Sequence, residues 1–318
     1  MFRACLFLLS MLLSGSVLAQ SYPSKPVRII VPFAPGAIND YVARAISQKF
    51  PEVFGQTLIT DNRPGGGTIV GTELVVRGAP DGYTLLLVSV AHAINPALFE
   101  KLPYDAQTDL THVTLVGAAP FVLVVNPALP AKTMKEFIAL AKSKPGQLNY
   151  GSSGTGGGSH LATELLNAMA GIELTHVPYK GAAPAIVDVL GGQITLTLAT
   201  ITAVGGHLKS GKLRALAVSS RKRTGAAPDL PTVAESCCAG YEASGWWNIA
   251  VTAATPKPIV AQLNTGVVKI LRMPDVVSSF AAQGVDLVGS TPEEALAQLK
   301  DETVRWGKVI RDKNIKPE

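Results

Sequence analysis

The chain has 318 residues, of which 47% are hydrophobic and 16% are charged, and its formal net charge is +5. This composition excludes a disordered chain and indicates a globular α/β protein of about two domains, at ~150 residues each. The basic residues are scattered except for the run at 221–223, which is typical of a solvated loop, so we expect no nucleic-acid partner.

The first 19 residues predict a secretory signal peptide. They carry one early cation, Arg3, an apolar core at residues 6–13, and a small-residue end at Ala19, near which we expect cleavage. This core is too short to span a membrane. No later apolar run reaches ~18 residues, so the sequence predicts a secreted, soluble mature protein.

The cysteines do not form a disulfide framework. Cys5 lies within the predicted signal peptide, so the mature chain keeps only Cys237 and Cys238. Adjacent cysteines rarely form a disulfide, because the bridge geometry strains the peptide between them. The two residues are therefore either free thiols or a strained local pair, and they do not make a metal-binding set.

Residues 28–50 predict a buried strand, a tight turn and an amphipathic helix. The strand is an apolar run of the kind found inside parallel sheets, and Pro35 and Gly36 end it. Asn39 and Asp40 are favourable residues for a helix N-terminus. The turn therefore presents free backbone N–H groups at the positive end of a helix dipole, which is an anion site that needs no Lys or Arg.

Residues 148–169 predict the same arrangement a second time. A short strand leads through a glycine-rich turn into a helix, and the glycines allow a ligand to approach the backbone closely. A single turn of this kind is an ordinary connection between a strand and a helix. Because the chain has two such turns, we expect them to face each other across a cleft and to hold one small carboxylate.

The remaining elements follow in chain order. Strands are predicted near 57–60 and 83–90, with a helix near 69–75 between them, and the residues from Ser89 to His92 are predicted to form a loop at the carboxyl end of the sheet, where ligands of open α/β sheets bind. Residues 95–109 are expected to be rich in loops.

The run at 115–125 predicts the crossing into a second lobe, and the strand at 246–252 predicts the return. Two crossings form a hinge, and two lobes about a hinge commonly enclose a small ligand. Helices are predicted near 133–143, 185–190, 204–209, 259–271, 275–283 and 292–311, and strands near 174–177, 194–198 and 213–218. The expected organisation is a signal peptide at 1–19, lobe one at 20–120, lobe two at 121–240, and a return to lobe one with C-terminal helices at 241–318.

Standard catalytic motifs are missing from the sequence. It has no G-x-S-x-G, no Walker-type G-K-[ST] and no H-x-x-x-H pair, so we expect no enzyme, no cofactor and no metal. The alternative is a secreted hydrolase or lyase in which Ser153 is the nucleophile and His160 the base. We favour a His160 that begins its helix and bonds a loop carbonyl.

Eight segments, in this order and spacing, make the chain resemble the Bug-type periplasmic receptors of tripartite tricarboxylate transporters. They are YPSKPVRIIVPFAPG (22–36), DNRPGGG (61–67), PDGYTLL (80–86), HAINPALF (92–99), KPGQLNYGSSGTGGGSHLA (144–162), HVPYKGAAPA (176–185), GKLRALAV (211–218) and TPKPIV (255–260). The resemblance implies a two-lobed α/β periplasmic-binding-protein fold (Venus flytrap, type II), each lobe a mixed sheet flanked by helices. It implies capture of a small organic carboxylate and delivery to membrane subunits. We expect a monomer; a ligand-sensing partner of a membrane signalling protein is the other role open to it.

The resemblance also implies which residues hold the carboxylate, through backbone N–H groups and hydroxyls. The expected ligand-binding residues are Phe33, Gly36, Ala37, Asn39, Asp40, Ser89, His92, Ser153, Gly154, Gly156, Gly157, Ser159, His160, Tyr179 and Thr200. The family often has acidic residues where this chain has Thr195, Ala199 and Thr200. Without an acidic partner for an amino group, we expect a carboxylic acid that has no α-amino group.

Several of these residues have simpler interpretations. Asp40 is expected to cap its helix rather than to touch the ligand, and packing inside lobe two is the other interpretation of Tyr179. Trp246 and Trp247 are expected in the hinge or the core rather than in the cleft.

Overall fold

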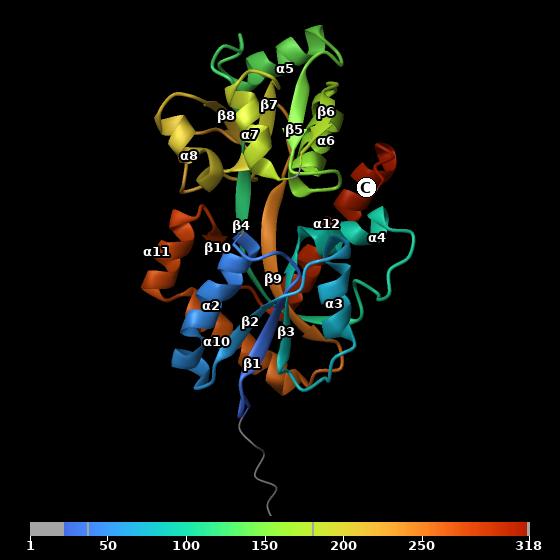
Figure 1. Cartoon of the computed structure of the whole chain (residues 1–318), viewed down its shortest axis with the longest axis vertical. Helices are drawn as coiled ribbons and strands as arrows, with labels where there is room; N and C mark the ends of the chain where they lie inside the picture. The colour runs from blue at the N-terminus through green and yellow to red at the C-terminus, as the bar shows by residue number, and fades with distance from the viewer. Residues whose placement is uncertain (1–21, 37, 180, 317–318) are drawn as a thin grey trace, which may run out of the picture.

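Residues 22–36, 38–179 and 181–316 are described by the computed structural model, which has two lobes (Figure 1). The predicted signal peptide, residues 1–19, and the predicted ligand residue Ala37 lie outside the described residues. An apolar β-rich core runs through both lobes, and helices cover its faces.

The first lobe begins with three parallel strands joined by helices. β1 lies between β2 and β3, and its fully buried isoleucines, Ile29 and Ile30, explain its central place in the sheet. These elements are β1 (Val27–Val31), α2 (Ile38–Phe54), β2 (Leu58–Asn62), η1 (Gly66–Thr68), α3 (Ile69–Val76), β3 (Thr84–Ser89) and α4 (Val90–Leu98).

Two long antiparallel strands run from one lobe to the other, β4 (Leu110–Val125) and β9 (Ser244–Thr252). β4 pairs with β9 as far as Pro120, and from Phe121 onward it pairs with β7 and β8 of the second lobe. Gly117 and Pro120 lie within β4 and do not break it, because β4 is one continuous strand with local register shifts. Figure 1 shows both strands between the lobes.

The second lobe repeats the parallel pattern with β5, β6 and β7. Thr133 caps α5 by accepting a hydrogen bond from the Glu136 N–H at 3.2 Å. The elements of this lobe are α5 (Met134–Ser143), β5 (Asn149–Ser152), α6 (Gly158–Ala170), β6 (Thr175–Pro178), α7 (Ala182–Leu190), β7 (Leu196–Thr200), α8 (Ile201–Lys209), β8 (Arg214–Val218) and α9 (Val233–Ser236).

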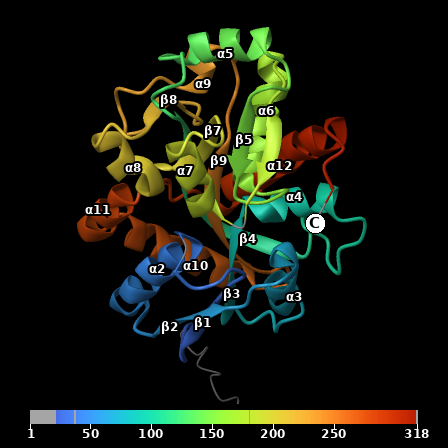
Figure 2. The same cartoon turned by 45° about the horizontal axis from the view of Figure 1, so that its top comes forward.

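The C-terminal elements return to the first lobe, and the last helix reaches the second. α12 begins with Pro292 after a capping box formed by Thr291 and Glu294. It packs against α4, β4 and α6 (Figure 2). The elements are α10 (Lys257–Leu271), α11 (Pro274–Ala282), β10 (Asp286–Leu287) and α12 (Pro292–Asp312).

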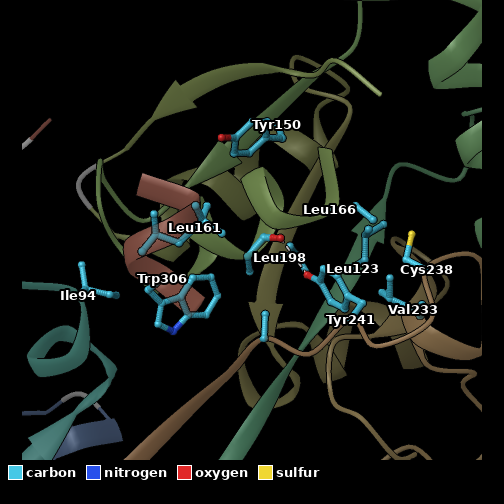
Figure 3. Close-up of a cluster of buried hydrophobic side chains, with 14 of the residues drawn as sticks. Ile94, Leu123, Tyr150, Leu161, Leu166, Leu198, Val233, Cys238, Tyr241 and Trp306 are labelled. Atoms are coloured by element: carbon cyan, nitrogen blue, oxygen red, sulfur yellow. Dashed lines mark hydrogen bonds between the residues drawn. The ribbon is translucent and has the colours of Figure 1, made fainter. Parts of the chain in front are cut away.

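One hydrophobic cluster is shared by the two lobes. Trp306 of α12 belongs to it together with Ile94 of α4 and Leu161 of α6, and Figure 3 shows the three side chains near one another. The same cluster continues to Tyr150 and Tyr241. The lobes are therefore joined by packed side chains as well as by strands.

The predicted loop after β3 is wrong. Ser89 ends β3, and α4 begins at the next residue, Val90, so the chain passes from strand to helix with no intervening turn. Asn95, which was expected to open a region rich in loops, lies inside the same helix.

Candidate ligand-binding site

Two cavities lie side by side between the lobes. The larger has a volume of about 460 Å³ and the smaller about 320 Å³. They share five lining residues, Phe33, Ala91, Ile94, Gly156 and Gly157. The two cavities are therefore chambers of one cleft.

The N-termini of four helices line the smaller chamber. α2 contributes Ile38 and Asn39, and Ser89, Gly157 and Thr200 are the N-cap residues of α4, α6 and α8. The four helices follow β1, β3, β5 and β7, whose carboxyl ends meet at the cleft. Four sets of helix N–H groups and four positive dipole ends thus surround one small volume. This arrangement favours a bound anion.

Ionisable side chains are missing from this lining. Among the residues that the structure describes, no Asp, Glu, Lys, Arg or His borders either chamber. An anion in the cleft would therefore be held by backbone N–H groups, hydroxyls and helix dipoles.

Ser89 is the most informative polar side chain of the smaller chamber. The residue is 7% exposed, and its hydroxyl does not cap α4. Within the described part of the chain it has no hydrogen-bond partner, although it lines the chamber. A hydroxyl that lines a cavity without a protein partner keeps its hydrogen bonds available for a ligand or water.

The β5–α6 loop is shaped by its own hydrogen bonds. The Ser159 hydroxyl accepts from the Ser153 N–H at 3.0 Å and lies 3.1 Å from the Ser153 hydroxyl. Gly154 and Gly156 have φ values of 131° and 74°, which side chains rarely adopt. Ser153, Gly156 and Gly157 line the smaller chamber, whereas Gly154 and Ser159 support the loop from behind.

His160 anchors this loop through its ring. Its Nδ1 accepts a hydrogen bond from the Gly156 N–H at 2.9 Å, which ties the side chain to the loop backbone. The ring stacks on that of His176 at 3.9 Å between centroids. The Ser153 hydroxyl is paired with Ser159 and makes no hydrogen bond to His160, so the geometry does not form the alternative nucleophile and base pair.

The β1–α2 loop is braced by Asp40, as the capping interpretation predicts. Its carboxylate accepts from the Gly36 N–H at 3.0 Å, from Arg44 at 2.8 Å and from Asn62 at 3.0 Å. The Arg44 hydrogen bond is the main cause of the lowered pKa of Asp40. Asp40 and Gly36 do not border either chamber, whereas Asn39 does and accepts from the Trp247 indole N–H at 2.6 Å.

The structure places His92 and Tyr179 away from both chambers. His92 lies in the first turn of α4, where its Nε2 is 2.9 Å from the Ala106 carbonyl oxygen, and burial lowers its pKa. The Tyr179 hydroxyl donates to Asp188 at 2.5 Å. Burial and this carboxylate raise the pKa of Tyr179 to about 12.

Aromatic walls are the part of the cleft that the sequence analysis missed. Trp246, Trp247 and Phe121 line the smaller chamber, and Leu98 and Phe99 line the larger one. The tryptophans were expected to lie in the hinge or the core, and both do belong to buried hydrophobic clusters, at 2% and 3% exposed, while they also line the chamber. The signal that would have placed them is the pairing of Trp247 with Ser89 across β9 and β3, which depends on tertiary structure.

The comparisons with known proteins agree with this geometry. Residues 42–315 match the model of the tripartite tricarboxylate transporter family receptor. The chain belongs to this family. The predicted family and the predicted two-lobed binding-protein fold are therefore confirmed.

This receptor has relatives over nearly its whole length. It is 37% identical over 306 residues to Protein BugT of Bordetella pertussis, covering 96% of this chain and 94% of that protein. It is 34% identical to the solved structure of R. palustris Rpa4515 with adipate, with a TM-score of 0.80, 93% of this chain covered and 100% of that chain. MatC (Rpa3494) from Rhodopseudomonas palustris with bound malate is 30% identical, with a TM-score of 0.76 and coverage of 91% and 100%.

The described residues contain neither a membrane-spanning helix nor a metal-binding cluster. Helices long and apolar enough to cross a membrane do not occur within 22–36, 38–179 or 181–316. In the same residues, no group of three or more His, Cys, Asp or Glu side chains could hold a metal ion.

Proposed function

We propose that this receptor captures a small organic carboxylate in the cleft between its lobes and delivers it to membrane subunits of a tripartite transporter. The observation that carries the proposal is the convergence of four helix N-termini on a chamber in which none of the described lining residues is ionisable. The carboxylate-bound relatives, one with adipate and one with malate, support the same ligand class.

The carboxylate lies in the smaller chamber in this proposal. The groups that hold it are the backbone of the β5–α6 loop, the N-termini of α2 and α8, and the Ser89 hydroxyl. The rest of the acid extends over Phe33 and Ile94 toward the larger chamber. The proposed contact residues are Phe33, Asn39, Ser89, Ser153, Gly156, Gly157 and Thr200.

The ligand has no α-amino group in this proposal. Thr200 stands where the family often has an acidic residue, and it lines the smaller chamber. An ammonium group there would meet four positive dipole ends and no carboxylate. Removal of its hydration shell would therefore not be compensated.

We also propose that the protein is exported to the periplasm and that its two lobes move about a hinge. The N-terminal signal pattern supports export to the periplasm. The change of partner of β4 between Pro120 and Phe121 supports a lobe boundary at that point, and the segment before β9 supports the second boundary near residue 240. Bending at these two places would open the cleft.

The test is thermal unfolding of the mature protein with a panel of small carboxylic acids, each compared with its amide. At about 100 times the dissociation constant, a ligand adds ~2.7 kcal/mol to the free energy of unfolding. We expect a rise in melting temperature with at least one acid and none with its amide. The protein is unfolded and refolded first, so that any ligand carried through purification is removed.

A second measurement distinguishes a receptor, which leaves its ligand unchanged, from an enzyme, which converts it. Mass spectrometry of the bound acid after long incubation should recover it unmodified and in one-to-one ratio with the protein. No response to any acid would contradict carboxylate capture. A response to amides equal to that of acids would contradict the dipole-based site, and turnover of the acid would favour the hydrolase or lyase.

A further inference from the structure

Cys237 and Cys238 are a pair of sulfur atoms that ligand capture does not use. Cys237 is the C-cap residue of α9 and is exposed, and Cys238 is 3% exposed. Their Sγ atoms are 2.7 Å apart. Figure 3 shows Cys238 beside Val233 and Tyr241 at the edge of the shared core.

The separation of the sulfurs lies between two chemical states. A disulfide bond is about 2.0 Å long. A separation of 2.7 Å is well inside the distance at which two unbonded thiols are in ordinary van der Waals contact. The two side chains thus point at each other and are almost at bonding distance.

The backbone holds the pair in this arrangement. The N–H groups of Cys237 and Cys238 both donate to the Val233 carbonyl oxygen, at 3.0 and 3.3 Å. The Cys238 carbonyl oxygen accepts from the Tyr241 N–H at 2.9 Å. These hydrogen bonds fix the turn that follows α9, so little movement is needed to join the sulfurs.

We propose that Cys237 and Cys238 form a reversible disulfide between sequence neighbours once the protein reaches an oxidising compartment. The two thiols lose two protons and two electrons and form one S–S bond. The oxidant is another disulfide, which is reduced to two thiols. The exposed Cys237 attacks it first, and Cys238 then displaces the second thiol from the mixed disulfide.

The bond is labile because of its position in the sequence. Ordinary disulfides join Cα atoms about 4.4–6.8 Å apart, whereas neighbouring Cα atoms are about 3.8 Å apart. A bond between them is strained, and strained or exposed disulfides are the more easily reduced ones. The closed ring contains no intervening residue, so it adds little to global stability.

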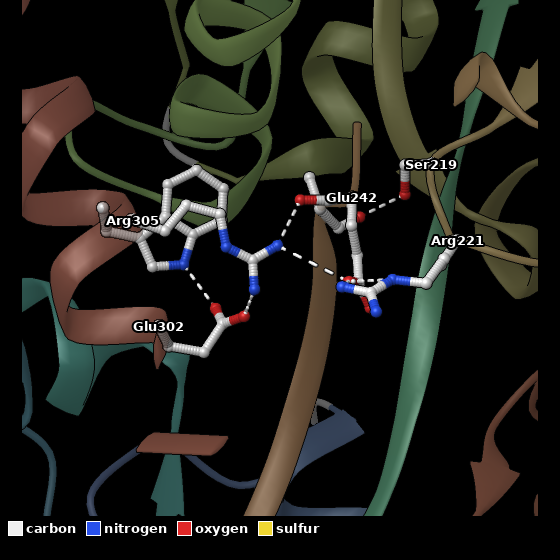
Figure 4. Close-up of polar contacts among 7 residues, drawn as sticks. Ser219, Arg221, Glu242, Glu302 and Arg305 are labelled. Carbon is white, nitrogen blue, oxygen red and sulfur yellow. Dashed lines mark hydrogen bonds and ion pairs between the residues drawn. The ribbon is translucent and has the colours of Figure 1, made fainter. Parts of the chain in front are cut away.

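The pair lies where the chain leaves the second lobe. A few residues later the Tyr241 hydroxyl donates to the Ala162 carbonyl of α6 at 2.9 Å. Glu242 then pairs with Arg221 at 2.8 Å and accepts from Arg305 of α12 through its backbone carbonyl at 2.7 Å (Figure 4). Oxidation would therefore fix the backbone at the start of the segment that leads into β9.

In the reduced state the Cys237 thiol is poorly reactive. Burial, together with the neighbouring thiol of Cys238, raises the pKa of Cys237 to about 12. Little Cys237 thiolate is present at neutral pH, so this residue reacts slowly with alkylating reagents in the folded protein. Thiol measurements must therefore be made on denatured protein.

The test uses the full-length protein exported to the periplasm and purified without reductant. The denatured protein is treated with N-ethylmaleimide and its intact mass is measured, with and without prior reduction. Cys5 leaves with the signal peptide, so only this pair is scored. We expect no adduct and a mass lower by two hydrogen atoms before reduction, and two adducts after it.

Two control variants establish the assignment. Cys237→Ser and Cys238→Ser each leave one thiol and should take one adduct in both conditions. Two adducts without reduction in the wild type would overturn the proposal. A mixed disulfide with glutathione, or a disulfide-linked dimer on a non-reducing gel, would overturn it as well. Ligand binding is measured on the same samples, so failure of carboxylate capture would be seen separately from the thiol result.

Discussion

Ser89 has a hydroxyl that borders the ligand chamber and has no partner among the described residues. A hydrogen bond to a charged group contributes about 1.5–3 kcal/mol. We expect Ser89→Ala to weaken carboxylate binding by about tenfold or more, since 1.4 kcal/mol corresponds to a factor of ten. Isothermal titration calorimetry measures this change.

A serine outside the cleft provides the control for that experiment. Ser278 lies on α11, where its hydroxyl donates to the Pro274 carbonyl at 2.8 Å. Ser278→Ala should leave the affinity unchanged. Equal dissociation constants for Ser89→Ala and the wild type would show that the Ser89 hydroxyl does not touch the ligand.

His112 makes stability depend on pH. It lies in β4, 2% exposed, and burial, with a smaller effect of His92, lowers its pKa from 6.5 to about 4. The unfolded chain protonates His112 more readily than the folded protein does. The stability that depends on a neutral His112 is therefore present above about pH 6.5 and is lost as the pH falls toward 4.

The size of this effect follows from the shift. Between about pH 7 and about pH 5 the free energy of unfolding should fall by about 2 kcal/mol through His112. Urea unfolding at the two pH values measures the fall, and His112→Gln should reduce it. A variant whose pH dependence equals that of the wild type would contradict the assignment.

In the proposed site the β5–α6 loop places its backbone against the ligand, so a side chain at Gly156 should interfere. Gly156 has φ 74°, and an added Cβ would lie 2.9 Å from Leu98 Cδ2. Gly156→Ala should cost about 1 kcal/mol of stability through its backbone conformation and should also weaken ligand binding. Calorimetry and urea unfolding measure the two effects.

A substitution at Gly171 separates the loss of stability from the loss of ligand affinity. It ends α6 with φ 60°, and a Cβ there would meet nothing within 4 Å. Gly171→Ala should carry a similar backbone cost and keep the affinity of the wild type. If both variants bind ligand equally well, the β5–α6 loop is not the binding loop.

The β1–α2 loop depends on Asp40, which braces it from outside the cleft. Asp40→Ala removes the acceptor of the Gly36 N–H and one of the two acceptors of the Asn62 amide, so we expect a loss of about 2 kcal/mol in stability and a severalfold weaker affinity. Urea unfolding and calorimetry on the same samples report both. Asp275→Ala, in the first turn of α11, removes a solvent-screened ion pair with Lys49 and should leave stability close to that of the wild type.

At this scale the sequence predicted the two βα units well and the β3–α4 junction poorly. The first unit is marked by Pro35 and Gly36 and the second by its glycines, so their turns are visible in the sequence. No Gly, Pro, Asn or Asp separates Ser89 from α4, and Pro96 lies inside that helix, so neither of its ends is marked in the usual way. The position of Ser89 at the cleft was therefore predicted, whereas the helix N-terminus that follows it was missed.

The whole molecule should unfold in one step, because the two lobes share a hydrophobic cluster. Trp306 is 1% exposed and connects the lobes with Ile94 and Leu161. We expect circular dichroism and tryptophan fluorescence to give coincident transitions in urea. Trp306→Ala should lower the free energy of unfolding by about 3–5 kcal/mol. Two separate transitions in the wild type would show that the lobes are independent.

The two-lobed architecture could be predicted from the order of the elements, because the apolar runs at β4 and β9 are long enough to cross between lobes. The walls of the cleft could not. Trp246 and Trp247 are adjacent on a strand, and sequence periodicity cannot tell which of them faces a cavity that forms only when β9 lies beside β3. Phe121 also lines the chamber, and its place there could not be predicted either, because it depends on the path of β4 between the sheets.

None of the described residues that line the cleft is titratable, so this lining neither takes up nor releases a proton when the cleft fills. With this lining, the protonation linked to occupancy is that of the ligand itself. Affinity would stay level while the surroundings acidify, and would fall about tenfold per pH unit only below the pKa of the acid. The cargo thus arrives at the membrane with its full negative charge. The membrane subunits must move that charge or balance it with cations.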